Sequence, residues 1–436
     1  MKRVLVLTSI ERAFYSSTIE YQLLEPIVEV AKRNENKFIY VGLVPITFWL
    51  SKRELISRFK VYRENREKIK KWLGSNHIPV SFIPILFPIW HRDFYLRIPW
   101  LILYIINSFP VILWILIWKR VNLIHSRNYP STLLSFFAKN VLGISYNFDM
   151  RDLYPEKAIE SGVFGKFRIQ QKCWSAHQHW SYRLWKFIEY KLVQEADYVI
   201  TTSEPFKKYV SEKLKVKSEK LKMIPNCVNT QRFKPDKEKR DKIRAQYGIT
   251  DKFVLLHSGT FGTEKDIPLV CRYFLKWERL DKLNSFSTGG THLVILCGTK
   301  EFLPKIRKIL MSVGVREEDY TLINPLPCEV PDYLLLGDVG LHLESMAIAT
   351  PYCIAVKDGE YLASGLPVIC TPWLRGIAHL IEKYQAGIVI DQTLNSNEQE
   401  LYLLKNYEEL REGGLKLVNE VLSLSHCIES LSDIYK

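Results

Sequence analysis

The sequence has no two cysteines spaced as in a CxxC motif, and its eight cysteines are scattered singly along 436 residues. Because structural zinc sites are usually built from such closely spaced pairs, this pattern argues against structural zinc. Scattered, unpaired cysteines are typical of a reducing compartment. A DxD-type metal motif is also absent from the sequence, and we expect the protein to need no metal ion.

A secretory leader is not evident either. The first residues, MKRVLVLTSI, have the basic start of a signal peptide, but the apolar run is very short and no small-residue cleavage site follows it. We interpret Val4–Leu7 as a buried first strand, and we expect a cytoplasmic protein.

Basic residues outnumber acidic ones, with 61 Lys and Arg against 47 Asp and Glu and a formal net charge of +14. This excess favours anionic partners such as nucleotide phosphates, acidic lipid headgroups or nucleic acid. The basic residues are not interleaved with aromatic ones as in RNA-binding motifs, so we expect no nucleic-acid partner. Apolar residues make up 47% of the chain, which excludes a largely disordered protein.

Short β-branched or apolar runs alternate with longer helical stretches in both halves of the chain. This alternation predicts an α/β fold, with parallel sheets covered by helices on both faces. The runs are too many for one comfortable sheet, so we expect two doubly wound domains that separate in the charged, aperiodic stretch 229–251. The predicted strands are Val4–Leu7, Phe38–Val44, Val80–Ile85, Leu123–His125, Ile144–Phe148, Tyr198–Thr201, Phe253–His257, Leu293–Cys297, Thr321–Ile323, Val339–Leu343, Pro367–Cys370 and Gly387–Ile390.

The segment 351–369, PYCIAVKDGEYLASGLPVI, combines a lysine, an acid and a small-residue patch with a strand-like run. We expect a helix to begin near Glu360, after a glycine-containing turn. A helix start can hold phosphate through free backbone N–H groups, a carboxylate can accept two hydrogen bonds from a ribose diol, and Lys357 can neutralise a diphosphate. The segment therefore predicts a nucleotide-sugar pocket, unless both charges are exposed on an ordinary helix-to-strand connection.

Three stretches of the chain resemble, in the same order, motifs of glycosyltransferase family 4. They are EADYVITTSEPFKKYV at 195–210, MIPNCVNTQRFKP at 223–235, where Cys227 and Asn229 replace the family's Gly and Asp, and KDGEYLASGLPVI at 357–369. The resemblance implies the GT-B fold, with two Rossmann-like domains facing each other across a cleft. It implies an acceptor-side domain 1–228, a linker 229–251, a donor domain 252–405 and a C-terminal helix 406–436 that packs back on the N-terminal domain.

The resemblance also implies a donor site in the second domain. Glu360 would hold the ribose hydroxyls of the donor, Gly365 would let the backbone pack closely, and Lys265 would contact the diphosphate and assist its departure. The residues implied in donor binding are Gly259, Thr260, Lys265, Lys357, Glu360 and Tyr361.

Two residues of this site depart from the family pattern. Thr260 stands where the family has an Arg, so Lys265 should carry more of the diphosphate contact, although a Lys does not replace the bidentate geometry of an Arg. Tyr352 stands where many relatives have a Glu, eight residues before Glu360, so backbone N–H groups of 351–356 should meet the donor sugar. Glu344 lies sixteen positions before Glu360 and does not restore the pair.

The first domain is expected to carry the acceptor and the catalytic wall. His125 and Arg127 end a strand where the family often has H-x-H, and either could stabilise charge on the leaving diphosphate as a catalytic residue; the alternative is a packed or capped polar residue at a loop start. Asp149, Arg151 and Asp152 follow the next strand and could bind an acceptor hydroxyl. They could equally form a self-paired surface turn.

Two further stretches concern a membrane. Residues 98–118 contain no charged residue, and the length could span a bilayer, but Pro99 and Pro110 favour a broken helix pair packed in the N-terminal domain and partly dipping into a membrane face. A wholly buried core helix is the alternative. Residues 51–73 read as a basic amphipathic helix of the kind that lies on anionic lipid, or else as a solvated charged helix.

Taken with the resemblance, these features imply a retaining glycosyltransferase that acts without cofactor or metal. A nucleotide-diphosphate sugar would be the donor, and a saccharide acceptor, favoured as lipid-linked, would be met at the inner face of the cell membrane during cell-surface polysaccharide synthesis. The transferred group would be a hexosyl or N-acetylhexosaminyl residue. The alternatives are a GT-B nucleotide-sugar epimerase and a non-catalytic membrane protein that binds nucleotide sugars.

Overall fold

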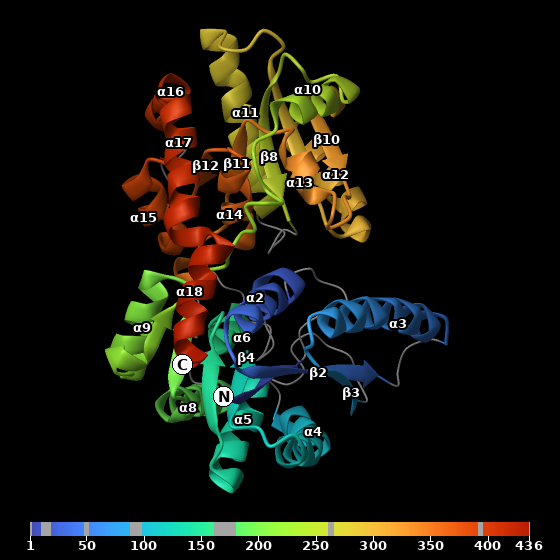
Figure 1. Cartoon of the computed structure of the whole chain (residues 1–436). Coiled ribbons are helices and arrows are strands. Elements are labelled where there is room, and N and C mark those ends of the chain that lie inside the picture. Colours follow the sequence, from blue (N-terminus) through green and yellow to red (C-terminus); the bar gives the residue numbers. More distant parts are fainter. Residues whose placement is uncertain are drawn as a thin grey trace. The chain divides into compact units, whose positions relative to one another are not determined.

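The computed structural model describes residues 2–9, 19–47, 52–87, 98–160, 180–259, 266–390 and 396–435. The chain forms two compact units (Figure 1). The first contains Met1–Ile224 and Ile428–Lys436, and the second contains Pro225–Cys427. Each unit is built on one parallel sheet with helices on both faces, which is the predicted α/β architecture.

The first unit contains a seven-stranded sheet in the order β3-β2-β1-β4-β5-β6-β7, and every neighbouring pair is parallel. All six strands predicted in this half are present. The seventh, β7, was not predicted because Lys222 interrupts its apolar residues. The strands are β1 Arg3–Ser9, β2 Lys37–Thr47, β3 Val80–Phe87, β4 Leu123–Arg127, β5 Ser145–Asp149, β6 Tyr198–Thr201 and β7 Leu221–Met223.

The helices of this unit divide between the two faces of the sheet. The chain moves outward from β1 to β3 and then returns to β4, so right-handed connections place α2 and α3 on one face and α4, α5 and α8 on the other (Figure 1). The helices are α2 Glu25–Arg33, preceded by a π-helical turn Glu20–Leu24, α3 Lys52–Ser75, α4 Ile98–Trp118, α5 Tyr129–Leu142, α6 Tyr154–Glu160, α8 Trp180–Glu195 and α9 Glu204–Leu214, with the end of α18 Leu424–Tyr435.

The second unit contains a six-stranded parallel sheet in the order β10-β9-β8-β11-β12-β13. Its strands alternate between two apolar cores, one on each face: Val254 and Leu256 belong to one core and Leu255 to the other. All six predicted strands are present, as β8 Phe253–Ser258, β9 Thr291–Leu296, β10 Tyr320–Ile323, β11 Val339–His342, β12 Val368–Cys370 and β13 Gly387–Val389.

The helices of the second unit cover both faces of its sheet. They are α10 Lys237–Gln246, α11 Asp266–Asn284, α12 Leu303–Val313, α13 Val330–Leu334, α14 Val356–Ala363, α15 Arg375–Tyr384, α16 Glu398–Lys405 and α17 Tyr407–Leu417. A π-helical turn, Val418–Leu422, leads from α17 into α18, and short 3-10 turns lie between several of the other elements.

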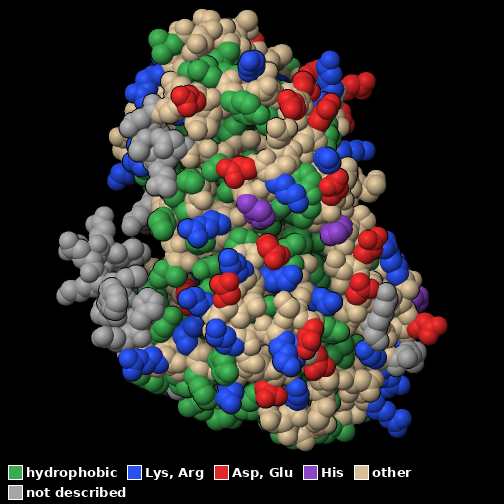
Figure 2. Space-filling model, turned by 90° about the vertical axis from the view of Figure 1, so that its left-hand side faces the viewer, with side chains coloured by type: hydrophobic (Ala, Val, Ile, Leu, Met, Phe, Trp, Pro, Cys, Tyr) green, Lys and Arg blue, Asp and Glu red, His purple; other side chains and the backbone are tan. Residues whose placement is uncertain are grey.

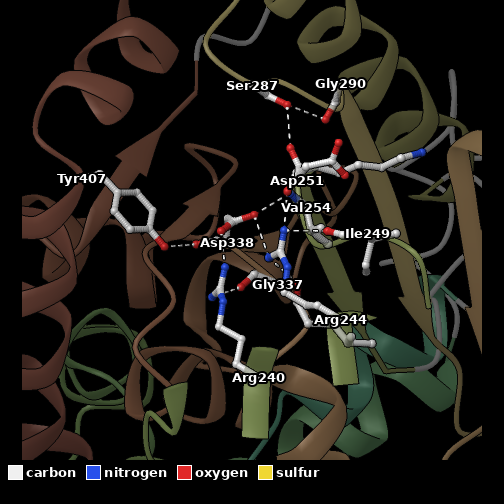
Figure 3. Close-up of polar contacts among 12 residues, drawn as sticks. Arg240, Arg244, Ile249, Asp251, Val254, Ser287, Gly290, Gly337, Asp338 and Tyr407 are labelled. Carbon is white, nitrogen blue, oxygen red and sulfur yellow. Dashed lines mark hydrogen bonds and ion pairs between the residues drawn. The ribbon is translucent and has the colours of Figure 1, made fainter. Parts of the chain in front are cut away.

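The stretch 229–251, expected as a linker, lies within the second unit and contains α10. Arg240 and Arg244, one helical turn apart, both bind Asp338 at the start of β11, with N–O distances of 2.5 and 3.1 Å (Figure 3). Asp338 also accepts a hydrogen bond from the backbone N–H of Val254, at the start of β8. The charges that suggested a solvated linker therefore fix α10 to the amino-terminal edge of the sheet.

Residues 406–427, expected to pack on the first domain, also belong to the second unit, whereas 428–436 belong to the first. The expected broken helix pair at 98–118 is instead one helix, α4, with Pro110 inside it. Proline lacks an N–H group and removes one bond of the helix, but here it does not end the helix.

Candidate donor and strand-end sites

In parallel α/β sheets, ligands bind beyond the carboxyl ends of the strands. In the second unit β8 ends at Ser258, and Gly259 follows with a φ of +118° that L side chains rarely adopt. Nothing lies within 4 Å of the position that a Cβ atom would take there, so backbone conformation, not crowding, favours glycine. Thr260 and Lys265 lie outside the described residues, and their roles stay predictions.

Tyr361, predicted to contact the donor, is fully buried and joins three elements of the site. Its hydroxyl accepts a hydrogen bond of 2.6 Å from the backbone N–H of Ser258 at the end of β8. Its ring covers Gly340 of β11, where an added Cβ atom would lie 2.4 Å from a ring carbon. Tyr361 therefore positions α14 against the ends of β8 and β11.

Glu360 lies in the fifth position of α14, one turn later than the sequence suggested, and Gly359 is helical and not part of a turn. The Glu360 side chain is partly buried, and no hydrogen bond or ion pair joins it to another residue in the described part of the chain. Burial raises its pKa to about 7, although Arg232 nearby opposes the shift. The carboxylate can thus accept hydrogen bonds from a ligand.

A chain of four charged groups, which sequence reasoning missed, runs beside Glu360. The buried His342 ring at the end of β11 contacts Asp358 through Nδ1 at 2.6 Å and Glu344 through Nε2 at 3.2 Å. Asp358 also accepts the backbone N–H of Ala355, which caps α14. Lys357 lies 3.8 Å from Glu344 and is largely buried. The sequence signal that could have revealed these contacts is the alternation of His342 and Glu344 at the end of a strand. Because β11 ends beside α14, Glu344 lies next to α14 although the two are far apart in the sequence.

The motif at 223–235 supports this site from within the same unit. The Asn226 side chain donates a hydrogen bond of 2.7 Å to the carbonyl of Ile354, just before α14. Gly365, at φ +80°, lies so close to Pro235 that an added Cβ atom would be 3.0 Å from its ring. The prediction that Gly365 permits close backbone packing is confirmed, and two of the three motifs meet around α14.

In the first unit, the predicted strand-end residues cluster around Asp149, at the end of β5. The Asp149 carboxylate lies 2.6 Å from Arg151 Nε, 3.6 Å from Arg127 NH1 and 3.8 Å from His125 Nε2. Burial alone would raise the pKa of Asp149, but Arg151, His125 and Arg127 together hold it well below its usual value. The structure therefore brings four of the five predicted residues into one charged cluster.

The burial of this cluster restricts what each residue can do. His125, Arg127 and Asp149 are all at most 3% exposed, and His125 Nδ1 is bonded to the Tyr435 hydroxyl at 2.8 Å. The Arg151 side chain retains 13% exposure. Asp152 instead pairs with Lys157 of α6 at 2.6 Å. The cluster as a whole holds positive charge at the carboxyl edge of the sheet.

Among the described residues, no group of three or more His, Cys, Asp or Glu side chains is placed to hold a metal ion. Metal independence itself stays a prediction.

Comparison with known proteins identifies the type of fold. A family model for Glycosyltransferase Family 4 matches residues 56–232. A chitobiosyldiphosphodolichol beta-mannosyltransferase from Kluyveromyces lactis is 25% identical over 250 residues, which are 52% of this chain and 54% of that protein. The match thus spans about half the length of the curated relative.

Solved structures match along the whole chain. Sucrose-phosphate synthase from Thermosynechococcus elongatus has a TM-score of 0.69 at 13% identity, covering 100% of this chain and 98% of its own. Anabaena HepE in complex with UDP has a TM-score of 0.62 at 12% identity, with coverages of 100% and 99%. A glycosyltransferase from Rickettsia africae has a TM-score of 0.64 at 14% identity, with coverages of 100% and 98%.

These likenesses show the GT-B fold that the motifs led us to expect. The matching family model covers the first of the three motifs and most of the second, so this part of the chain is similar to glycosyltransferase family 4.

Proposed function

We propose that the protein transfers a hexosyl or N-acetylhexosaminyl residue from a nucleotide-diphosphate sugar to a saccharide acceptor carried on a lipid. The observation that carries the proposal is the partly buried Glu360 carboxylate, which is bound to no described residue and lies at the carboxyl edge of a Rossmann-like sheet. HepE was solved with UDP and with UDP-glucose. The Kluyveromyces relative is named for a mannosyl transfer to a dolichol-linked diphosphate saccharide, which supports a lipid-linked acceptor.

In this proposal the residues around α14 bind and orient the donor. Glu360 accepts hydrogen bonds from the ribose hydroxyls, and the first turn of α14 faces the same edge of the sheet. Lys357, with Lys265 from the loop after Gly259, supplies positive charge to the diphosphate as the glycosidic bond breaks. Because charge develops on the leaving diphosphate, cations fixed there lower the barrier and no metal ion is needed.

The residues around Asp149 serve the acceptor side of the proposal. The hydroxyl of the acceptor attacks the anomeric carbon, the bond to the diphosphate oxygen breaks, and the hydroxyl proton leaves with the diphosphate or to solvent. Arg127 and His125 are too buried to reach far, so they act by holding Asp149 and Arg151 in place. Arg151, the most exposed of the four, is the one we expect to contact a substrate.

The stereochemical course is part of the proposal and follows the family resemblance, which favours retention. The anomeric proton of the product, observed by NMR, distinguishes retention from inversion. An α-anomeric donor that yields a β-linked product would contradict retention and leave the transfer itself intact.

The function is tested by incubating the full chain with labelled UDP-sugars and GDP-sugars and a bacterial membrane lipid extract. We expect label to move into the lipid fraction for one donor, and Glu360→Gln to abolish most of that transfer. Glu412→Gln, at an exposed position of α17, is the matched control and should transfer normally. An epimerised donor without lipid product, or binding without turnover, would contradict the proposal.

The protein is also proposed to work in the cytoplasm as a peripheral protein at the inner, anionic face of the cell membrane, in polysaccharide synthesis. A lipid-linked acceptor presents its saccharide at such a surface. Fractionation of cells that produce the protein tests this location, and recovery entirely in the soluble fraction at low salt would contradict it.

A further inference from the structure

Helix α4 exposes a continuous apolar stripe along most of its length. Only 33% of the most apolar stretch within Pro99–Trp118 is buried inside the protein. At about 100° per residue, the exposed positions fall within roughly half of the helix circumference, which places them on one side of the helix. The large apolar side chains on this side, with their exposed fractions, are Ile102 51%, Ile106 64%, Val111 37%, Trp114 58%, Ile117 62% and Trp118 61%.

The topology prevents α4 from crossing a bilayer as a single span. The helix joins β3 to β4, and both strands are parallel members of the same seven-stranded sheet. A crossing helix would leave those two strands on opposite sides of the membrane. The exposed stripe must therefore meet its partner while the helix lies along the surface of the unit.

The apolar surface continues beyond α4 onto the neighbouring helices of the same sheet face. The Phe109 ring of α4 packs edge-on against Phe137 of α5 at 5.7 Å, and Val141 near the end of α5 is 61% exposed. On α8, Trp180 and Phe187 are 60% and 58% exposed. Figure 1 places α4, α5 and α8 along the lower side of this sheet, and Figure 2, which presents the side where α8 lies, shows hydrophobic side chains next to Lys and Arg at its lower end. Apolar patches this extensive mark interaction sites.

The charges around this face are mainly positive. Residues 98–118 contain no acidic or basic side chain, and Lys119 follows with its Nζ 4.0 Å from the centre of the Trp118 ring. Arg120 is exposed next to it, and on α8 Lys191 lies over the Phe187 ring. The two acids nearest the end of α8, at 195 and 197, are both paired with Lys139.

An apolar stripe that ends in stacked indoles and cations is the composition of a helix lying in a lipid headgroup region. Trp114 and Trp118 stack with ring centres 4.9 Å apart. Indole rings are amphipathic and prefer the interface, and the adjoining cations can meet lipid phosphates.

We propose that the outer side of α4, with Trp114 and Trp118 as its anchors, inserts in the plane of an anionic lipid surface. The proposal extends the proposed function by assigning the face of the protein that meets the membrane. It rests on the proposed function only for the reason why the protein would bind a membrane. The basic helix α3 lies on the opposite face of the sheet, so the two sequence features expected to act together cannot both lie flat on one membrane.

The test is co-sedimentation of the full chain with vesicles of phosphatidylcholine, alone and mixed with phosphatidylglycerol. We expect binding to the mixed vesicles, and a loss of about tenfold or more in Trp114→Gln/Trp118→Gln, because each interfacial indole contributes roughly a kcal/mol or more of burial. Leu283→Gln, at a 79% exposed apolar position of the second unit, is the control and should bind as the original chain does.

A second variant distinguishes vesicle binding through α4 from vesicle binding through α3. Neutralising Lys52, Arg53, Arg58 and Lys60 of α3 should leave most vesicle binding in place. Release by this change, full binding by the tryptophan variant, or a dimer in light scattering that the tryptophan variant abolishes would each overturn the proposal. Nucleotide binding by calorimetry is measured in parallel. If the original chain binds vesicles but no nucleotide, the proposed function is refuted and this inference is not.

Discussion

His342 at the end of β11 and Asp358 in the first turn of α14 form a buried pair, with 2.6 Å between Nδ1 and Oδ1. Both side chains are at most 1% exposed. Burial alone would lower the pKa of His342, but the neighbouring Asp358 raises it above the usual value for histidine. The pair thus fixes α14, the helix that carries Glu360, to the end of β11.

The first prediction concerns this pair. Asp358→Asn should lower the free energy of unfolding by about 1–3 kcal/mol, because the buried His342 ring keeps Glu344 at Nε2 but loses the carboxylate at Nδ1. In a double-mutant cycle with His342→Gln, the coupling energy should reach about 1–3 kcal/mol. Chemical denaturation measures both quantities. The exposed pair of Arg307 and Glu317 provides the control cycle, with an expected coupling below about 1 kcal/mol. Equal coupling in the two cycles would refute the role of the buried pair.

The second prediction uses the raised pKa of Glu360. With a pKa of about 7 in the free protein, about half of the Glu360 carboxyls carry a proton at pH 7. Ribose hydroxyls that donate to the carboxylate favour its charged form, so nucleotide binding should release up to about half a proton per site at pH 7. Calorimetry in buffers of different ionisation enthalpy measures this release. It should be absent in Glu360→Gln, and that variant should bind about 10–100-fold more weakly.

The same carboxyl affects stability with a defined sign. The pKa of Glu360 in the folded protein lies above its ordinary value of 4.5, so the folded state of the unliganded protein holds this proton more tightly than the unfolded state. The contribution is complete below pH 4.5 and is lost as pH rises to about 7. Each pKa unit corresponds to about 1.4 kcal/mol, and partial exposure reduces the effect to an expected 1–2 kcal/mol. Denaturation at pH 5 and pH 8 should show this loss in the original chain and not in Glu360→Gln.

The strands could be predicted from the sequence because buried parallel strands are short apolar runs, and those runs are bounded clearly in this chain. One element that was predicted wrongly is α10, which was expected to be a linker. Its run of Lys, Arg, Glu and Asp has low hydrophobicity, which is also the signature of a linker. Only the structure shows Arg240 and Arg244 meeting Asp338, because that contact joins residues more than ninety positions apart.

The candidate site was predicted in part for a related reason. Glu360 and Gly365 belong to a contiguous motif, so their neighbourhood could be recognised in the sequence. His342 and Glu344 lie beside α14 only because β11 ends next to it in the sheet, a relationship set by strand order. The His125 ring likewise contacts Tyr435, which lies about three hundred residues away in the chain.

The third prediction concerns Gly340 under the Tyr361 ring. Gly340→Ala would place a Cβ atom 2.4 Å from a ring carbon and displace Tyr361 from Ser258. Overpacking of this kind typically costs about 1–3 kcal/mol, and the shift of α14 should also weaken nucleotide binding. Gly298→Ala, where nothing lies within 4 Å of the new atom, is the control and should change neither property. Thermal unfolding measures the stability of the two variants, and calorimetry measures their nucleotide binding. Equal stability of the two variants would contradict the packing role of Gly340.

The fourth prediction concerns Asp338, which holds α10 to the sheet. Asp338→Asn removes the charge that both Arg240 and Arg244 contact, and Arg244 is only 4% exposed. The buried Arg244 would then lack its counter-charge, so we expect the second unit to lose about 3–5 kcal/mol of stability. Arg240→Gln should cost about 1 kcal/mol or less, because that side chain is 27% exposed and water can replace the contact. Hydrogen exchange of the second unit measures both effects. If α10 is a solvated linker, no buried charge depends on Asp338. Both variants should then have nearly the stability of the original chain.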